Sequence, residues 1–311
     1  MNLKRRMFLL VGGATLIAGV MIPAVSQASP PRPDLAPVHA TSVRGRTTEG
    51  LPEPAQARVG GRPSNNGISY RGGPVMTSGQ NAYIIWYGNW APTKQTIIQD
   101  FLGHLGGSPY FNINTSYYDS ASNRVKNSIT LAGQTTDAYS ITGGQSSTYS
   151  LSDSDIQTIV TSAVTKNNWK DPNGVFFVLT SVDVKKSGFL TAYCGWHTYA
   201  TIANTNTKFA FVGDPGTNGA CSMQTSISPN GDVGADAMVS VIAHEIEESA
   251  TDPNLNAWYD SRGNENADKC AWTFGSTYTA NGALANMKLG TRNYLVQRNW
   301  VNASGGYCSL S

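Results

Sequence analysis

Charged residues are scarce in this sequence, and neither sign dominates. Asp, Glu, Lys and Arg make up only 14 % of the 311 residues, with 22 basic residues against 20 acidic ones. A disordered chain would carry more charge and fewer apolar residues than the 40 % found here. Beyond Lys4–Arg6 there is no basic run that could follow a phosphate backbone, so we expect no nucleic-acid partner.

Several motifs of common enzymes are also missing. The chain has no G-x-S-x-G sequence, which disfavours a serine hydrolase of that type, and no G-x-G-x-x-G or Walker sequence for nucleotides. None of the four cysteines forms a C-x-x-C pair, which argues against a zinc–thiolate site. After the first 28 residues no run of 18 apolar residues occurs, so we expect no membrane contact once a leader is removed.

The first 28 residues are typical of an export signal. Lys4–Arg6 precede an apolar run over Met7–Val25, and Ser26-Gln27-Ala28 offers the small residues that a signal peptidase recognises. The Arg5-Arg6 pair also fits a twin-arginine signal. We therefore predict a secreted or periplasmic protein, exported by the Sec or twin-arginine route. A retained membrane anchor is the alternative, because the apolar run is long enough to span a bilayer.

The rest of the chain divides into a linker and one domain. Residues 29–68 are rich in Pro, Arg, Gly and Ser, which predicts a mostly disordered linker or propeptide. Residues 69–311 alternate between predicted strands and helices, which favours a single α/β domain with a mixed β-sheet flanked by helices. The strands are expected over 81–87, 174–181 and 208–213, and helices over about 93–105 and 235–251. The spacing of Ser152 and Asp155 predicts a capping box, before an apolar helical stripe from Ile156 to Val164. Residues 110–150 are expected to form irregular strands, and residues 255–311 short strands and turns.

The four cysteines are an even set in a chain that we expect to be exported. Such a set predicts two disulfides, for which three pairings are possible. We favour Cys194–Cys221 and Cys270–Cys308, because each of these pairs closes a loop of moderate length.

Acidic residues are unevenly distributed. Seven of the 20 lie between residues 244 and 268: Glu245, Glu247, Glu248, Asp252, Asp260, Glu265 and Asp268. Like charges at this density repel one another unless they are solvated or share a cation. The cluster therefore indicates either a cation site or a solvated acidic helix that binds no metal.

The helical spacing favours the cation site. His244 and Glu248 lie one turn apart on one helix face, as in the zinc-hydrolase motif His-Glu-x-x-His with Glu as the second ligand. Glu245 would then be the general base for water activated by Zn²⁺. Candidates for the rest of the coordination sphere are Glu265, Asp268 and Asp252, with Asp268 alternatively orienting His244. Ca²⁺ is the competing cation, although an imidazole ligand favours a transition metal.

Other side chains have two interpretations each. His197 either completes a metal site or is a hydrogen-bonded structural residue, and His39 and His104 are expected to be structural or solvated. Several aromatic residues either stack on sugar rings or pack in the core: Trp86, Tyr87, Trp90, Tyr117 and Tyr118.

Several stretches resemble the EXORDIUM / phosphate-induced protein 1 family, known mainly from plant cell walls. They are YRGGPV at 70–75, IIWYGNW followed by IIQDFLGHL, VFFVLTSVD at 175–183, CGWH at 194–197, SPNGDVGADAMV at 228–239, TDP at 251–253, and RNYL at 292–295 with Cys308. The resemblance covers about 70–311. It implies an extracellular protein associated with growth or cell-wall responses, and no particular reaction. We predict that the His244-Glu245 pair marks a microbial branch of that family.

Two functions follow from these patterns. The first is an exported metal-dependent hydrolase, resembling a zinc peptidase on a zincin-like active-site helix, which acts as a monomer on a peptide or cell-wall polymer. Its ligands would be His244 and Glu248, and its base Glu245. The second is a non-catalytic extracellular module associated with the cell wall or a polysaccharide, in which the acidic residues order a loop. A secreted structural protein without metal is a third option.

Overall fold

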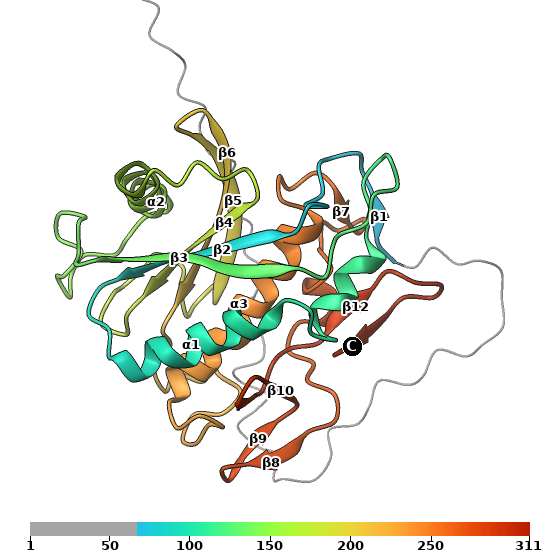
Figure 1. The fold of residues 1–311 in the computed structure, drawn as a ribbon. Helices are drawn as coiled ribbons and strands as arrows, with labels where there is room; N and C mark the ends of the chain where they lie inside the picture. Colours follow the sequence, from blue (N-terminus) through green and yellow to red (C-terminus); the bar gives the residue numbers. More distant parts are fainter. Residues whose placement is uncertain (1–66) are drawn as a thin grey trace, which may run out of the picture.

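A computed structural model of the protein describes residues 67–311. They form three layers, in which a five-stranded sheet has α1 and α3 on one face and α2 on the other (Figure 1). The predicted export signal over 1–28, residues 29–66 of the predicted linker and His39 lie outside the described residues.

The sheet is mixed, as the sequence predicts. Its order is β3-β2-β4-β6-β5, with parallel pairing throughout except between β6 and the edge strand β5. The strands are β2 (Gln80–Tyr87), β3 (Ile129–Asp137), β4 (Gly174–Thr180), β5 (Gly195–Ile202) and β6 (Thr205–Gly213). The prediction of a single α/β domain with a mixed sheet is therefore confirmed.

Both faces of the sheet are covered by helices, so its central strands contain continuous apolar runs, Ala82–Tyr87 in β2 and Val175–Leu179 in β4. In β2, Ala82, Ile84 and Trp86 pack on the side of α1 (Pro92–Leu105) and α3 (Val233–Thr251). Its alternate residues Tyr83, Ile85 and Tyr87 pack on the side of α2 (Asp153–Asn167). The predicted aromatic candidates Trp86, Tyr87 and Tyr117 are buried core residues, while Tyr118 is exposed.

Among residues 67–311, every helix is too short or too polar to span a bilayer.

Short elements complete the domain, mostly in the predicted turn-rich tail. The short elements are β1 (Ser69–Tyr70), η1 (Phe111–Ser116), β7 (Trp258–Tyr259), η2 (Asp268–Cys270), β8 (Tyr278–Ala280), β9 (Ala283–Ala285), β10 (Met287–Leu289), β11 (Arg292–Tyr294), β12 (Asn299–Val301) and β13 (Tyr307–Ser309).

Both favoured disulfides are present. Cys194, next to β5, is bonded to Cys221, and Cys270 of η2 is bonded to Cys308 of β13. No free cysteine remains among the described residues. The second bridge fixes the segment that follows Glu265 to the C-terminal hairpin.

Helix α2 begins with a capping box at Ser152 and Asp155, as their spacing predicts. Burial by itself would raise the pKa of Asp155. Hydrogen bonds from the amide and hydroxyl of Ser152 and from the Tyr149 hydroxyl outweigh burial and lower it. A carboxyl whose pKa falls on folding stabilises the fold when it is ionised, and that contribution is lost as pH falls through its folded pKa.

We expect Asp155→Asn to lower the free energy of unfolding by about 1 kcal/mol at pH 7. The difference from the wild type should shrink below about pH 4, where the carboxyl of the unfolded chain becomes protonated before that of the folded protein. Urea denaturation at pH 7 and at pH 3.5 measures both values. An equal difference at the two pH values would contradict a charge-dependent cap.

Candidate metal centre

Helix α3 lies between the sheet, α1 and the C-terminal segments, so it is buried on all sides. Asp232 begins it, its carboxylate accepting a hydrogen bond from the amide of Ala235. Its final two turns carry His244, Glu245, Glu247 and Glu248, each at most 1 % exposed. A helix buried all round is normally apolar, so four ionisable groups at its end need partners.

The first group around Glu248 contains three of the predicted ligands. His244 Nε2 lies 3.0 Å from Glu248 Oε1 and 3.6 Å from Asp268 Oδ1. The three donor atoms fall within 4.8 Å of one another, close enough to hold one metal ion. Asp268 faces the same imidazole nitrogen as Glu248 does. That position suits a ligand better than a residue that orients the ring from its other nitrogen.

Negatively charged carboxylates dominate the surroundings of His244. Burial would lower the pKa of His244, but the Glu248 and Asp268 carboxylates outweigh burial and raise it to about 10. Burial, together with Asp268, raises the pKa of Glu248 although His244 opposes that shift. A divalent cation would balance these carboxylates better than the single proton on His244 does.

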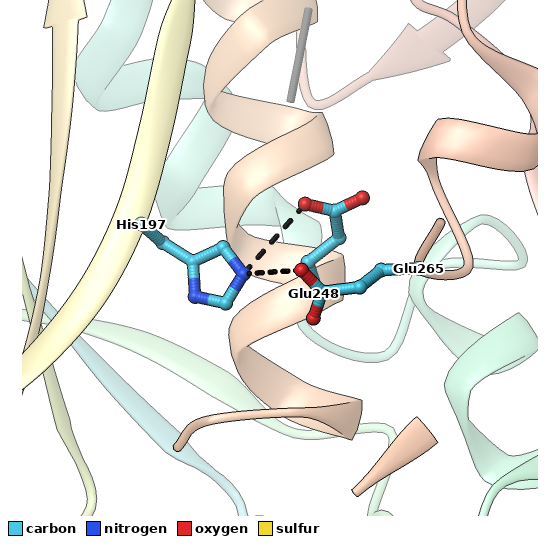
Figure 2. Close-up of side chains that lie close together, drawn as sticks. All are labelled: His197, Glu248 and Glu265. Carbon is cyan, nitrogen blue, oxygen red and sulfur yellow. Dashed lines mark hydrogen bonds and ion pairs between the residues drawn. The ribbon is translucent and has the colours of Figure 1, made fainter. Parts of the chain in front are cut away.

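A second group uses His197, which sequence reasoning left as either structural or metal-binding. His197 lies on β5, and its Nε2 is 3.2 Å from Glu265 Oε2 and 3.7 Å from Glu248 Oε2 (Figure 2). All three side chains are completely buried. These donors too fall within 4.8 Å of one another. Its position within β5, in CGWH, gives no spacing signal, because the sheet and not the helix brings it to Glu248.

Backbone contacts hold the loop that carries Glu265 and Asp268. Asp260 accepts hydrogen bonds from the amides of Arg262 and Asn264, and these bonds outweigh burial and lower its pKa. The amide of Glu265 donates to Asp268 Oδ2, and the amide of Asp268 donates to Glu248 Oε1, each at 3.0 Å. The loop is therefore fastened to α3 at the residue that both groups share.

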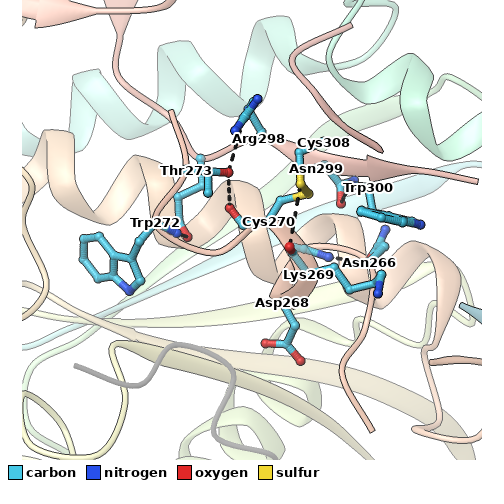
Figure 3. Close-up of a disulfide and its surroundings, with 12 residues drawn as sticks. Asn266, Asp268, Lys269, Cys270, Trp272, Thr273, Arg298, Asn299, Trp300 and Cys308 are labelled. Carbon is cyan, nitrogen blue, oxygen red and sulfur yellow. Dashed lines mark hydrogen bonds between the residues drawn. A yellow bond between two sulfur atoms is a disulfide. The ribbon is translucent and has the colours of Figure 1, made fainter. Parts of the chain in front are cut away.

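The disulfide between Cys270 and Cys308 lies directly after this loop (Figure 3). The Asp268 side chain points away from the bridge, while Lys269 and Asn266 lie beside it. The crosslink thus restrains the backbone of η2 without contacting the carboxylate that faces His244.

The predicted base, Glu245, packs against β5. A Cβ atom added to Gly195 would lie 2.7 Å from Glu245 Oε1 and 2.6 Å from Val241 Cγ1. Gly195 and His197 are two residues apart and so share the strand face that looks toward α3. Glu245 consequently lies on the same side of the sheet as His197, without belonging to either group of donors.

We expect Gly195→Ala to destabilise the protein by about 1–3 kcal/mol, because the new methyl group overlaps Val241 and Glu245. The matched control is Gly103→Ala in α1, where an added Cβ meets nothing within 4 Å. That change should stabilise the helix by about 0.5–1 kcal/mol. Urea denaturation of chelator-treated protein measures both. Equal effects of the two changes would contradict close packing at Gly195.

The remaining acidic residues of the cluster have other roles. Glu247 accepts a hydrogen bond from the Asn299 side chain, and burial raises its pKa well above the ordinary value. Asp252, a predicted ligand, ends α3 and accepts the amides of Asn256 and Ala257 at 2.5 and 2.6 Å. The structure brings neither residue into the two groups of metal donors. His104 lies away from them, on α1 beside Asp100.

Comparisons with known proteins agree with the resemblance seen in the sequence. A family profile described as the phosphate-induced protein 1 conserved region matches residues 68–297. Protein EXORDIUM-like 3 of Arabidopsis thaliana is 30 % identical over 283 residues, which cover 78 % of this chain and 82 % of the relative.

Two further plant relatives are more distant. Protein EXORDIUM of Arabidopsis thaliana is 27 % identical, covering 67 % of this chain and 74 % of its own. Protein PHOSPHATE-INDUCED 1 of Nicotiana tabacum is 28 % identical, covering 63 % and 68 %. No solved structure is significantly similar to this chain. The assignment to a microbial branch stays a prediction.

Proposed function

The chain belongs to the phosphate-induced protein 1 (EXORDIUM-like) family, and we propose, from its own side chains, that it is an exported metal-dependent hydrolase. The observation that supports metal binding is the convergence of two imidazoles and three carboxylates from α3, β5 and the 265–268 loop. Two disulfides support export to an oxidising compartment. His244 and Glu248 are the central ligands of the proposal.

The donor set favours zinc or a similar transition metal. Imidazole nitrogen with carboxylate oxygen suits Zn²⁺, whereas Ca²⁺ prefers oxygen ligands alone. Such an ion would supply Lewis-acid activation of water and of the bond to be cleaved. Ca²⁺ remains the competing occupant, to be distinguished by metal analysis.

Glu245 supplies the proton transfer in this proposal. Its carboxylate would take a proton from the attacking water as the water oxygen adds to the carbonyl carbon of a peptide. It would then return that proton to the leaving amine as the C–N bond breaks. Support for this role comes from the position of Glu245 against Gly195 of β5, on the side of the sheet that His197 also faces. A peptide or a cell-wall polymer is the proposed substrate class.

Metal analysis of the mature protein tests the ligand assignment. We expect stoichiometric metal in the wild type and less metal in His244→Ala, which loses the ion that His244 binds. The matched control is His104→Ala, which removes a half-exposed imidazole on α1 and should leave the metal content unchanged. Wild-type protein without metal after reconstitution with zinc would refute the proposal.

A second candidate is a non-catalytic module associated with the cell wall or a polysaccharide. Two observations favour it. The relatives' names attach no reaction to the family. The side chains of His197, Glu248 and Glu265 are fully buried, which is the property of a closed structural metal site. In this case the metal would order the loop around Glu265 and nothing more.

Binding to an insoluble polysaccharide separates the two functions. The second candidate predicts that the protein is pulled down with the polymer, with and without chelator, and that no soluble fragments are released. The hydrolase proposal predicts release of fragments from a protein or a polymer, and its loss when chelator is added.

A further inference from the structure

The two oxygens of Glu248 face two different groups of ligands. Oε1 lies 3.0 Å from His244 Nε2, and Oε2 lies 3.7 Å from His197 Nε2. The five donor residues do not form one cluster within 4.8 Å. They form two triads, His244–Glu248–Asp268 and His197–Glu248–Glu265, which share only Glu248.

The spacings within each triad match donors arranged around an ion. Two donors that each lie about 2.0–2.1 Å from one tetrahedral ion are roughly 3.3 Å apart. The distances from each imidazole to the two carboxylates of its triad are 3.0 and 3.6 Å in the first triad, and 3.2 and 3.7 Å in the second. The two longer ones exceed a direct hydrogen bond. The donor spacings of each triad therefore fit an ion of its own.

The hydrogen bonding of the two Glu248 oxygens gives independent support. Oε1 already accepts the amide of Asp268. Oε2 is buried and accepts no hydrogen bond from any residue between 67 and 311. A buried carboxylate oxygen that accepts no hydrogen bond is costly. It points toward His197 and Glu265, where a cation would satisfy it (Figure 2).

We propose that Glu248 bridges two divalent metal ions, one held with His244 and Asp268 and the other with His197 and Glu265. This inference rests on the proposed metal-binding function and raises the number of bound ions from one to two per chain. Three carboxylates offset three of the four positive charges. Ions bridged in this way lie about 3.5–4 Å apart, a spacing at which both can act on the attacking and leaving atoms of one substrate.

Metal stoichiometry of the full mature chain tests the bridge. Protein is loaded with ZnCl₂, freed of loosely bound ions and analysed for zinc. We expect two ions in the wild type and one in each of His197→Ala and Asp268→Asn. Glu247→Gln is the matched control, an isosteric change on the same helix outside both triads, and should retain two. Circular dichroism of each variant checks folding.

Wild-type protein gives a second readout that does not depend on the variants. Loaded with Co²⁺, it should show magnetic coupling between two neighbouring ions. One zinc ion per chain without coupling would overturn the bridge and leave the proposed function intact. Zero zinc would overturn both. One ion in the wild type and none in both variants would assign all five residues to a single ion.

Discussion

Glu245→Gln should lower the rate of hydrolysis by roughly 10²–10⁴-fold and leave the metal content unchanged. The change keeps the shape of the side chain against Gly195 but removes the oxygen that takes the proton. Metal should stay, because Glu245 belongs to neither triad of donors. The measurement is kcat on a substrate that the wild type cleaves, together with metal analysis of both proteins.

Glu247→Gln is the matched control for that experiment. It makes the same chemical change two residues away on α3, at a carboxyl that binds Asn299 and whose pKa burial keeps high. Its rate should stay within about twofold of the wild type, since loss of proton transfer alone accounts for the larger effect. The hydrolytic mechanism would be contradicted if Glu245→Gln kept wild-type turnover, or if both variants lost activity equally.

Removing the metal should lower the melting temperature on the order of 10 °C. A ligand at about 1,000 times its Kd stabilises the folded state by about 4 kcal/mol, and a domain of this size shifts about 2–4 °C per kcal/mol. The physical reason is the buried acid cluster: without a cation, Glu248, Glu265 and Asp268 face one another around two imidazoles. Thermal denaturation with and without EDTA measures the shift.

The chelator effect should shrink in His244→Ala, which lacks the ion that His244 binds. In the control His104→Ala the full shift should remain. A metal-loaded wild type whose melting temperature does not respond to EDTA would show that the ion contributes nothing to the fold, and would place it outside the buried centre.

Local patterns in the sequence predicted most of the fold. The apolar runs at 81–87 and 174–181 became β2 and β4, and the apolar spacings at 93–105 and 235–251 became α1 and α3. The capping box at Ser152 and both disulfides were also confirmed. Strands, helices and caps depend on residues close together in the sequence, and four cysteines allow only three pairings. Such features can therefore be predicted from a single sequence.

Long-range placement could not be predicted. The sequence does not predict strand β5, because CGWHTYATI is neither a continuous apolar run nor a clear alternation of apolar and polar residues. Its conformation is decided by pairing with β6. The sequence therefore left His197 as either metal-binding or structural, with no spacing that linked it to Glu248. The acidic cluster predicted a site near His244. Which of its carboxylates become metal donors, which one binds Asn299 and which one ends the helix depends on what packs around α3.

Crystals of the mature protein, purified without added metal or chelator, offer the most direct test. Anomalous difference maps recorded on both sides of the zinc absorption edge locate bound zinc independently of any activity assay. The account predicts a peak about 2.0–2.2 Å from both His244 Nε2 and a Glu248 oxygen. It would be contradicted by well-ordered His244 and Glu248 side chains with no anomalous peak between them, including after the crystals are soaked in zinc.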